Sequence, residues 1–138
     1  MIVDTARHCE IVVIESPYGD EDPKVVHANE IYLDFCLRDA LNAGHAPFAS
    51  HGLYTRRFCL NDRNPAQRMT GIYAGFAFKR AASKTQFYTD LGMSPGMKLA
   101  RNYCEQQRYT LEFCYLPKEL FEEYLQTCEQ LQLTPKQH

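Results

Sequence analysis

The sequence predicts a single α/β domain over residues 1–138, built as a small doubly wound parallel sheet of about four to five strands with helices on both faces. Three observations predict this fold class. Strand-like and helix-like segments alternate four times, as right-handed crossovers between parallel strands require. A chain of 138 residues, 45% of them hydrophobic, suits one domain with its own core. No repeat or low-complexity segment interrupts the alternation.

The first strand is expected at residues 10–15, "EIVVIE". A short β-branched run closed by Ser16 and Pro17 is typical of a strand that is buried on both faces. A helix should begin at Pro23, because proline is favoured in the first helical turn, and Gly44 should end it. The apolar positions at helical spacing in this segment are Leu33, Cys36, Leu37, Ala40 and Leu41.

A second strand is expected at residues 45–51, "HAPFASH". Pro47 cannot donate a hydrogen bond to a neighbouring strand, so this strand should lie at an edge of the sheet. A loop covers residues 52–64. The next helix is predicted over residues 64–81, with Asn64 as its N-cap and a proline at its first position.

The third strand is predicted at residues 84–90, "KTQFYTD". Ser94 and Pro95 have the pattern of a helix start and lead into a helix that reaches residue 107. Residues 109–116, "YTLEFCYL", alternate well enough for a fourth strand. Residues 117–133 form a terminal amphipathic helix.

Composition and charge exclude several classes of function. The formal net charge is −2 with no basic stripe, which excludes duplex nucleic acid as a partner. The N-terminus has no basic region before an apolar one, and no apolar run approaches the roughly 20 residues of a membrane helix. We therefore expect a cytoplasmic protein without membrane contact. The six cysteines, which form no CxxC pair, are expected to be reduced core thiols.

No metal and no cofactor are expected. The spacing of His, Cys, Asp and Glu residues does not suggest a metal site, and neither the dinucleotide-binding nor the P-loop glycine pattern occurs.

Three of the loops that follow predicted strands are rich in polar residues and glycine, namely "ESPYGDED", "SHGLYTRR" and "TDLGMSPGM". Ligands of doubly wound sheets bind at this edge, beyond the carboxyl ends of the strands. Ser94 and Gly96 suit a phosphate or carboxylate at a helix N-terminus, and Asp90 suits a ribose hydroxyl. His51 and Tyr54 suit contacts with a base. Each of these residues also has a simpler explanation: Ser94 only caps a helix, Asp90 only forms a turn, and His51 is only exposed on a loop.

In their order along the chain, "SPYG", "GHAPFASH", "NDRNPAQRMTGIYAG" and "TDLGMSPGMKLA" resemble a family of small proteins. Many of its members come from phages, and the family is related to the nucleoside 2-deoxyribosyltransferases. The resemblance covers roughly residues 10–116. It implies a flavodoxin-like domain that binds a nucleoside or nucleotide and forms homodimers or higher homo-oligomers, with a neighbouring subunit helping to build the pocket. Enzymes of this superfamily cleave or exchange the bond between a base and a deoxyribose.

Carried over by position, the resemblance implies a set of ligand-binding residues. Ser16, Pro17, Tyr18 and Gly19 would line the sugar and base region, and Asp90 would be a strand-end acid that contacts the ligand. Ser94 and Gly96, with Met97 beside them, would face a 5′-hydroxyl or phosphate. The positions typical of the phage-rich family, whose roles the resemblance does not define, are Tyr18, His51, Tyr54, Asp62 and Arg68.

The chemistry of the related transferases needs a glutamate nucleophile that attacks the anomeric carbon. The resemblance places that glutamate at Ala100, which cannot act as a nucleophile. Asp90 is the expected substitute, acting as a base that activates water. Three hypotheses stay open: an N-glycosidase or deoxyribosyltransferase that uses Asp90, a non-catalytic module that sequesters or senses a nucleotide, and a dimeric interaction protein.

Overall fold

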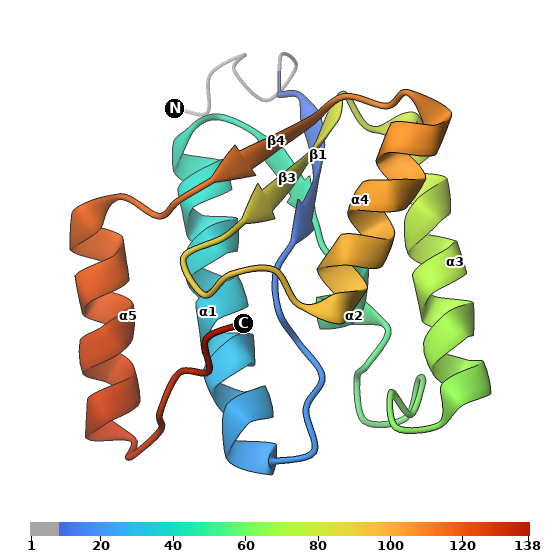
Figure 1. Cartoon of the computed structure of the whole chain (residues 1–138). Helices are drawn as coiled ribbons and strands as arrows, with labels where there is room; N and C mark the ends of the chain where they lie inside the picture. Colours follow the sequence, from blue (N-terminus) through green and yellow to red (C-terminus); the bar gives the residue numbers. More distant parts are fainter. Residues whose placement is uncertain (1–8) are drawn as a thin grey trace.

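A computed structural model describes residues 9–138 and shows a four-stranded parallel sheet between helices (Figure 1). The strands are β1 (Ile11–Glu15), β2 (Ala46–Phe48), β3 (Lys84–Tyr88) and β4 (Leu111–Cys114), in the order β2-β1-β3-β4. All neighbouring pairs are parallel. The predicted doubly wound, flavodoxin-like α/β fold is therefore confirmed. The expectation about a leader at the start of the chain concerns residues 1–8, outside the described part.

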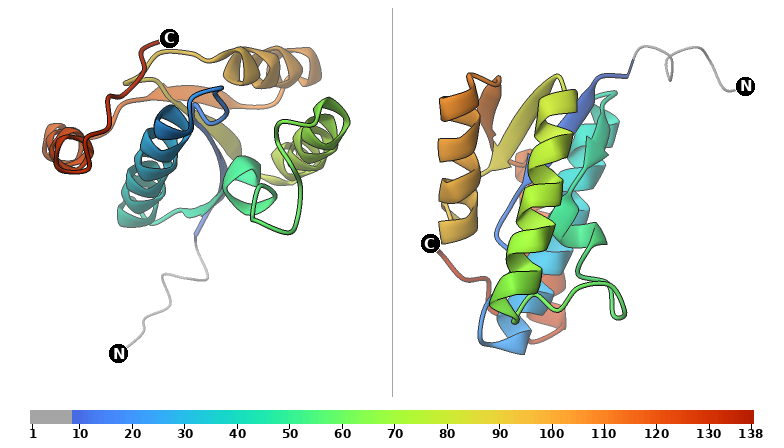
Figure 2. Two further views of the ribbon diagram at one scale, coloured as in Figure 1. Left: turned by 90° about the horizontal axis from the view of Figure 1, so that it is seen from below. Right: turned by 90° about the vertical axis from the view of Figure 1, so that its right-hand side faces the viewer.

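The helices are α1 (Pro23–Asn42), α2 (Ser50–Leu53), α3 (Pro65–Ala81), α4 (Pro95–Gln107) and α5 (Lys118–Gln130). Helices α1 and α5 cover one face of the sheet, and α3 and α4 cover the other (Figures 1 and 2). The chain leaves β1 towards the first face and leaves β3 towards the second. The two connections therefore diverge between β1 and β3, which is the switch point where ligands of such sheets bind.

Strand β1 is a central strand, and its sequence explains its position. Val12, Val13 and Ile14 are all buried, as expected for an apolar run that faces helices on both sides. Strand β2 pairs only with β1, through the register Val12 with Pro47, and so lies at an edge. The prediction from Pro47 is confirmed, because a residue without an N–H is tolerated where no further strand needs it.

Three helices begin with the same device, a capping side chain followed by proline. The side chains of Asp22, Asn64 and Ser94 accept hydrogen bonds from the backbone N–H groups of Lys24, Gln67 and Met97, respectively. A proline stands at the first position of each helix, where its missing N–H costs nothing. These caps fix the starts of α1, α3 and α4, two of which border the site described below.

Two hydrophobic clusters hold the layers together. The larger lies under α1 and α5 and includes Tyr32, Phe35 and Tyr124, and the smaller joins Phe87 of β3 to Met97 and other residues of α4. The hydroxyl of Tyr124 donates to the backbone oxygen of Ala28 at 3.1 Å, so that this buried polar group is satisfied.

The structure corrects some predicted boundaries. The second strand ends at Phe48, and residues 50–53 form the single turn α2 where the sequence predicted strand and loop. Four residues are too few to show a helical period, which explains this error. The fourth strand is limited to residues 111–114. Cys36, Cys104 and Cys128 are buried as expected, but Cys59 is exposed on the loop after α2.

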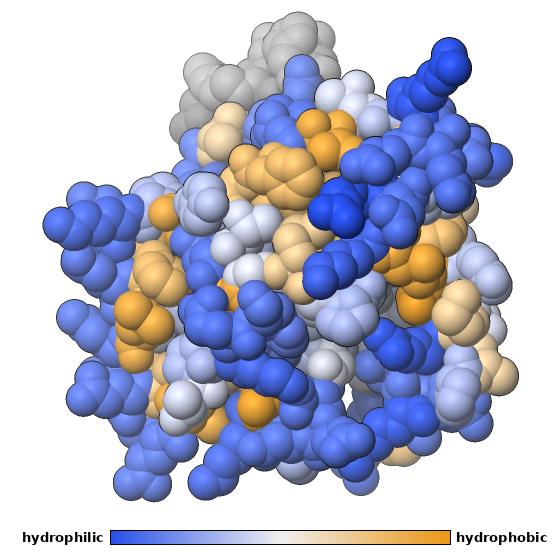
Figure 3. All heavy atoms as spheres, in the orientation of Figure 1, coloured by the Kyte–Doolittle hydropathy of each residue, from blue (hydrophilic) through white to orange (hydrophobic). Residues whose placement is uncertain are grey.

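Hydrophilic side chains cover most of the face seen in Figure 3, and the apolar ones form smaller groups. Among residues 9–138, no helix is both long enough and apolar enough to cross a membrane.

Candidate functional site

A cavity of about 390 Å³ lies at the carboxyl edge of the sheet, at the switch point. Its wall combines the end of β1 and the loop after it, helix α2, one face of α3 and the first turns of α4. Side chains that were distant in sequence therefore meet around one space. The lining residues from these four regions include Glu15, Ser16, Tyr18, Gly19, His51, Arg68, Phe76, Lys79, Ser94, Gly96, Met97 and Ala100, and Asp62 is added by the loop between α2 and α3.

A serine and a histidine are paired in this cavity. Ser16 follows β1 directly, is buried, and has its Oγ 3.0 Å from Nε2 of His51 on α2. Burial lowers the pKa of His51 below its ordinary value, so its imidazole is neutral at neutral pH. A neutral ring nitrogen can accept a proton or a hydrogen bond from a ligand hydroxyl. The ring of Tyr18 packs edge-on against the imidazole of His51, with the ring centroids 5.5 Å apart, and so restricts the orientation of that imidazole.

A buried ion pair lies beside this serine and histidine. Nζ of Lys79 on α3 is 2.5 Å from Oε1 of Glu15 at the end of β1. Only 2% of the Lys79 side chain and 12% of the Glu15 side chain are exposed to solvent. The Lys79 ammonium also lies 5.5 Å from the centre of the Phe76 ring. Both charges belong to the cavity wall, so a ligand would meet them directly.

The N-terminus of α4 forms another part of the wall. Ser94 caps this helix, and its Oγ accepts from the backbone N–H of Met97 at 3.3 Å. A side-chain carbon added at Gly96 would lie 3.7 Å from Nη2 of Arg68, so the arginine lies beside the first turn of α4. No acidic side chain among residues 9–138 forms an ion pair with Arg68. The helix dipole and this guanidinium together favour an anionic group.

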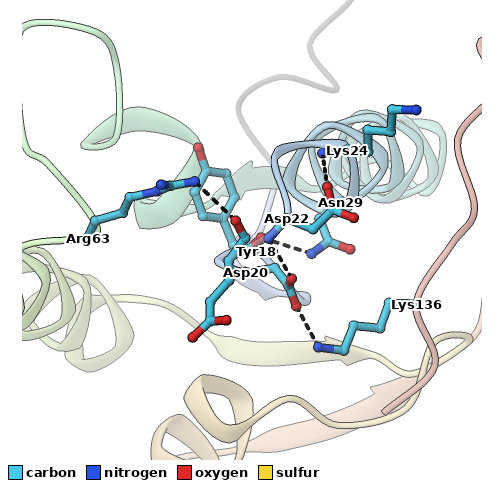
Figure 4. Close-up of polar contacts among 8 residues, drawn as sticks. Tyr18, Asp20, Asp22, Lys24, Asn29, Arg63 and Lys136 are labelled. Atoms are coloured by element: carbon cyan, nitrogen blue, oxygen red, sulfur yellow. Dashed lines mark hydrogen bonds and ion pairs between the residues drawn. The ribbon is translucent and has the colours of Figure 1, made fainter.

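The loop after β1 is hydrogen-bonded to α1 and is in close contact with the loop between α2 and α3. Asn29 of α1 donates from Nδ2 to the backbone oxygen of Tyr18 at 2.8 Å (Figure 4). A side-chain carbon at Gly19 would lie only 2.7 Å from Oδ2 of Asp62, so the close approach of this carboxylate requires a glycine there. Burial raises the pKa of the Tyr18 hydroxyl, which therefore stays protonated and can donate to a ligand.

A wider groove of about 940 Å³ adjoins the cavity and shares Tyr18, Gly19, Asp20, Asp62 and Arg68 with it. Its further lining comes from the loop between α2 and α3 and includes Arg57 and Arg63. Figure 4 shows Arg63 reaching across the groove, where its Nη2 donates to the backbone oxygen of Glu21 at 3.4 Å.

The last residues of the chain complete the wall. Lys136 and His138 line the cavity, and Nζ of Lys136 is 2.5 Å from Oδ2 of Asp20 (Figure 4). The backbone N–H of His138 donates to the backbone oxygen of Leu91 at 2.9 Å. This segment thus joins the loop after β1 to the loop after β3.

Comparison with protein-family models gives one match. Residues 10–114 match the model of a domain of unknown function, DUF7768. The chain belongs to this family. The matched residues run from β1 through β4 and contain the cavity wall except Lys136 and His138. No curated protein matches the chain.

The DUF7768 domain brings most of the predicted site residues together. They come from four separate segments of the sequence and meet because the carboxyl ends of parallel strands share one edge. The predicted residues that line the cavity are Ser16, Tyr18, Gly19, His51, Asp62, Arg68, Ser94, Gly96 and Met97.

Asp90, the predicted catalytic residue, lies elsewhere. Its Oδ2 accepts from the Tyr32 hydroxyl at 2.5 Å and from the backbone N–H of Leu116 at 3.1 Å. It does not line the cavity, because the loop after β3 turns its side chain towards α1 and β4. The structure therefore places Asp90 outside this cavity, where its carboxylate joins α1 to the segment after β4.

Two other predicted residues are also outside the cavity. Pro17 is fully buried beneath the loop and so cannot contact a ligand. Tyr54 packs edge-on against Phe48, with ring centroids 6.3 Å apart, and lines a separate small hollow of about 40 Å³. His51, Asp62 and Arg68 line that hollow as well, so Tyr54 lies behind the cavity wall.

Five ionisable residues that line the cavity were not predicted as site residues: Glu15, Asp20, Lys79, Lys136 and His138. For Lys79 a signal existed, since it follows Phe76 by three residues and Ile72 by seven, on the apolar stripe of α3. A lysine on such a stripe is unusual. Lys136 and His138 follow α5 in a segment without a periodic pattern, so no local signal in the sequence could have placed them at the cavity.

Residues 9–138 contain no group of three or more His, Cys, Asp or Glu side chains placed to hold a metal ion.

Proposed function

We propose that this DUF7768 protein binds a nucleoside or nucleotide in the cavity at the switch point. The volume of about 390 Å³ falls within the range of roughly 300–1,000 Å³ that is typical of small-molecule pockets. The wall offers an apolar side, from Ile72, Phe76 and Met97, and a polar side, from Ser16 and His51. A flat base suits the apolar side, and sugar hydroxyls suit the polar one.

The observation that carries this proposal is the position of Arg68 beside the first turn of α4. Its guanidinium has no acidic partner among the described residues, and Ser94 and Gly96 at the start of α4 line the same cavity. A 5′-phosphate would satisfy both, since helix N-termini and arginine bind phosphate through charge-assisted hydrogen bonds. We therefore expect a nucleoside monophosphate to bind more tightly than the nucleoside.

Thermal unfolding of the purified protein with a panel of deoxynucleosides and their monophosphates tests the proposal. A ligand at 100 times its dissociation constant stabilises the folded state by about 2.7 kcal/mol. Arg68→Gln should weaken the monophosphate at least tenfold and leave the nucleoside unchanged. Arg80→Gln, on the same helix but outside the cavity, is the matched control. No stabilisation by any member of the panel would contradict the proposal.

A second candidate role is self-association through α3. Tyr73 is 62% exposed on this helix and Phe78 is also exposed, whereas only Gly75 and Lys79 of α3 are buried. An exposed tyrosine on a helix suits a contact between subunits, because aromatic residues are enriched in interfaces. Light scattering of the same sample tests this role, and a monomeric mass would contradict it.

A further inference from the structure

The buried ion pair between Glu15 and Lys79 is not explained by ligand binding alone. Two charges that are removed from water lose much of their solvation energy, and apolar residues of the same size often serve the fold as well or better. Buried charges that line a cavity are instead typical of reactive sites. Glu15 and Lys79 are almost entirely buried, at 12% and 2% exposure, and both line this cavity.

A second ion pair in the same sheet provides the contrast. Nζ of Lys84 on β3 is 3.2 Å from Oε1 of Glu112 on β4, and these side chains are 21% and 42% exposed. That pair lies outside the cavity, is longer, and remains in contact with water. The sheet therefore accommodates a glutamate and a lysine at its surface, and the burial of Glu15 and Lys79 is particular to the cavity.

Glu15 is also free to meet a ligand. Its Oε1 contacts Lys79, whereas Oε2 has no hydrogen-bond partner among residues 9–138. Both oxygens of Asp20, another carboxylate in the wall, are occupied by the backbone N–H of Asp22 and by Lys136. Helix α4 contributes no carboxylate to the cavity. Asp62 is the remaining one, and it lies on a loop, whereas Glu15 ends a central strand and is held by Lys79.

We propose that Glu15 is the catalytic carboxylate of this site, and Lys79 the residue that positions it, for hydrolysis of the bond between base and sugar in a bound nucleoside or nucleotide. This inference rests on the function proposed above. It places the reactive carboxylate at the end of β1, whereas the resemblance to the transferases places their glutamate at Ala100 on α4.

The reaction uses water as its only co-substrate. Oε2 of Glu15 accepts a proton from a water molecule as the water oxygen bonds to the anomeric carbon. The bond from that carbon to the base nitrogen breaks, and its electron pair leaves with the base, which takes up a proton from solvent. Glu15 then returns its proton to solvent. The products are the free base and the free sugar or sugar phosphate.

The charged and titratable groups near Glu15 come from three helices and one loop. The cation that faces it is Lys79 from α3, while His51 from α2 is neutral because burial lowers its pKa. Burial raises the pKa of the Cys104 thiol on α4, so this neighbour is also uncharged. Arg68 and Asp62 line the same cavity. A single opposite charge at 2.5 Å therefore dominates the field at the carboxylate.

The first test measures release of free base by chromatography and binding by calorimetry, for the wild type and Glu15→Gln. The wild type should release base from at least one deoxynucleoside or its monophosphate. Glu15→Gln should lower kcat by a factor of about 100 to 10,000, the usual contribution of a general base, with affinity changed less than threefold. Glu112→Gln removes the glutamate of the exposed ion pair and should leave both quantities unchanged.

The second test uses Lys79→Met and compares kcat with ligand affinity. Loss of the lysine releases the Glu15 carboxylate from its fixed position, so kcat should fall about tenfold or more, while the affinity measured by calorimetry changes less than about threefold. A lysine with only a structural role would leave the kcat of the folded protein unchanged. If Glu15→Gln does not fold, Glu15→Gln/Lys79→Met removes both buried charges and keeps the volume. This double variant should bind the ligand and release no base.

The outcomes separate this inference from the proposed function. Binding of a nucleotide without release of base would overturn the role of Glu15 and leave the binding function intact. An unchanged kcat in Glu15→Gln, or its loss only in Asp62→Asn, would also overturn it. Failure of every nucleoside and nucleotide to bind would overturn the proposed function itself.

Discussion

The two faces of the sheet differ in what they bury. Under α1 and α5 lie fifteen core residues in one cluster, against four under α4 on the opposite face, counted over the described part of the chain. The first face buries tyrosine hydroxyls that donate to carboxylate or backbone acceptors, such as Tyr88 to Asp39 at 2.7 Å. The second face contains the cavity and the ion pair of Glu15 and Lys79. The first face thus supplies most of the hydrophobic core, and the second contains the buried ion pair and the cavity.

The largest expected effect tests the first face. Asp90→Ala removes the acceptor of the Tyr32 hydroxyl and of the Leu116 N–H, and each buried donor left unpaired costs about 1–3 kcal/mol. The free energy of unfolding in urea should fall by about 3 kcal/mol. Ligand affinity should be unchanged, because Asp90 does not line the cavity. Asp34→Ala, at an exposed position of α1, is the control. Weaker binding with unchanged stability would show that Asp90 belongs to the site.

A smaller effect is expected when the buried charges of the second face are removed. Glu15→Gln/Lys79→Met replaces an ion pair by neutral groups of similar size, an exchange that is often neutral or stabilising. The free energy of unfolding should stay within about 1 kcal/mol of the wild type or rise. The matched change in the exposed pair is Lys84→Met/Glu112→Gln. If the free energy of unfolding of Glu15→Gln/Lys79→Met falls by more than about 3 kcal/mol, the buried ion pair stabilises the domain. The difference proposed between the two faces would then be wrong.

The smallest effect concerns His51 and pH. Burial lowers the pKa of His51 below its ordinary value of 6.5, so the unfolded chain binds a proton that the folded protein does not. Stability should therefore fall as the pH drops through about 6.5. In His51→Gln this part of the pH dependence should disappear from denaturation curves recorded between pH 7 and 5. His27→Gln, which removes an exposed histidine of α1, is the control. Identical slopes for the wild type and His51→Gln would refute the burial argument.

Much of the fold was predictable because its signals are local. The apolar run of β1, the proline of β2 and the capped starts of three helices each lie within a few residues. Most of the site followed from one topological rule, that the loops after parallel strands share an edge. The position of Asp90 depends on contacts that are not local, since its partner Tyr32 is 58 residues away. Glu15 and Lys79 are separated by 64 residues, so no spacing rule could have paired them.

The contacts made by Lys136, Gln137 and His138 bear on how one wall of the cavity is built. Gly92 has a φ of +81° and lies so close to the backbone oxygen of His138 that no side chain would fit between them. This glycine belongs to the matched domain, whereas Lys136 and His138, which it allows to reach the cavity, follow the matched residues. One wall of the cavity therefore comes from a part of the chain that the family model does not cover, and substitutions at Lys136 or His138 would change the shape and charge of the cavity without altering the sheet.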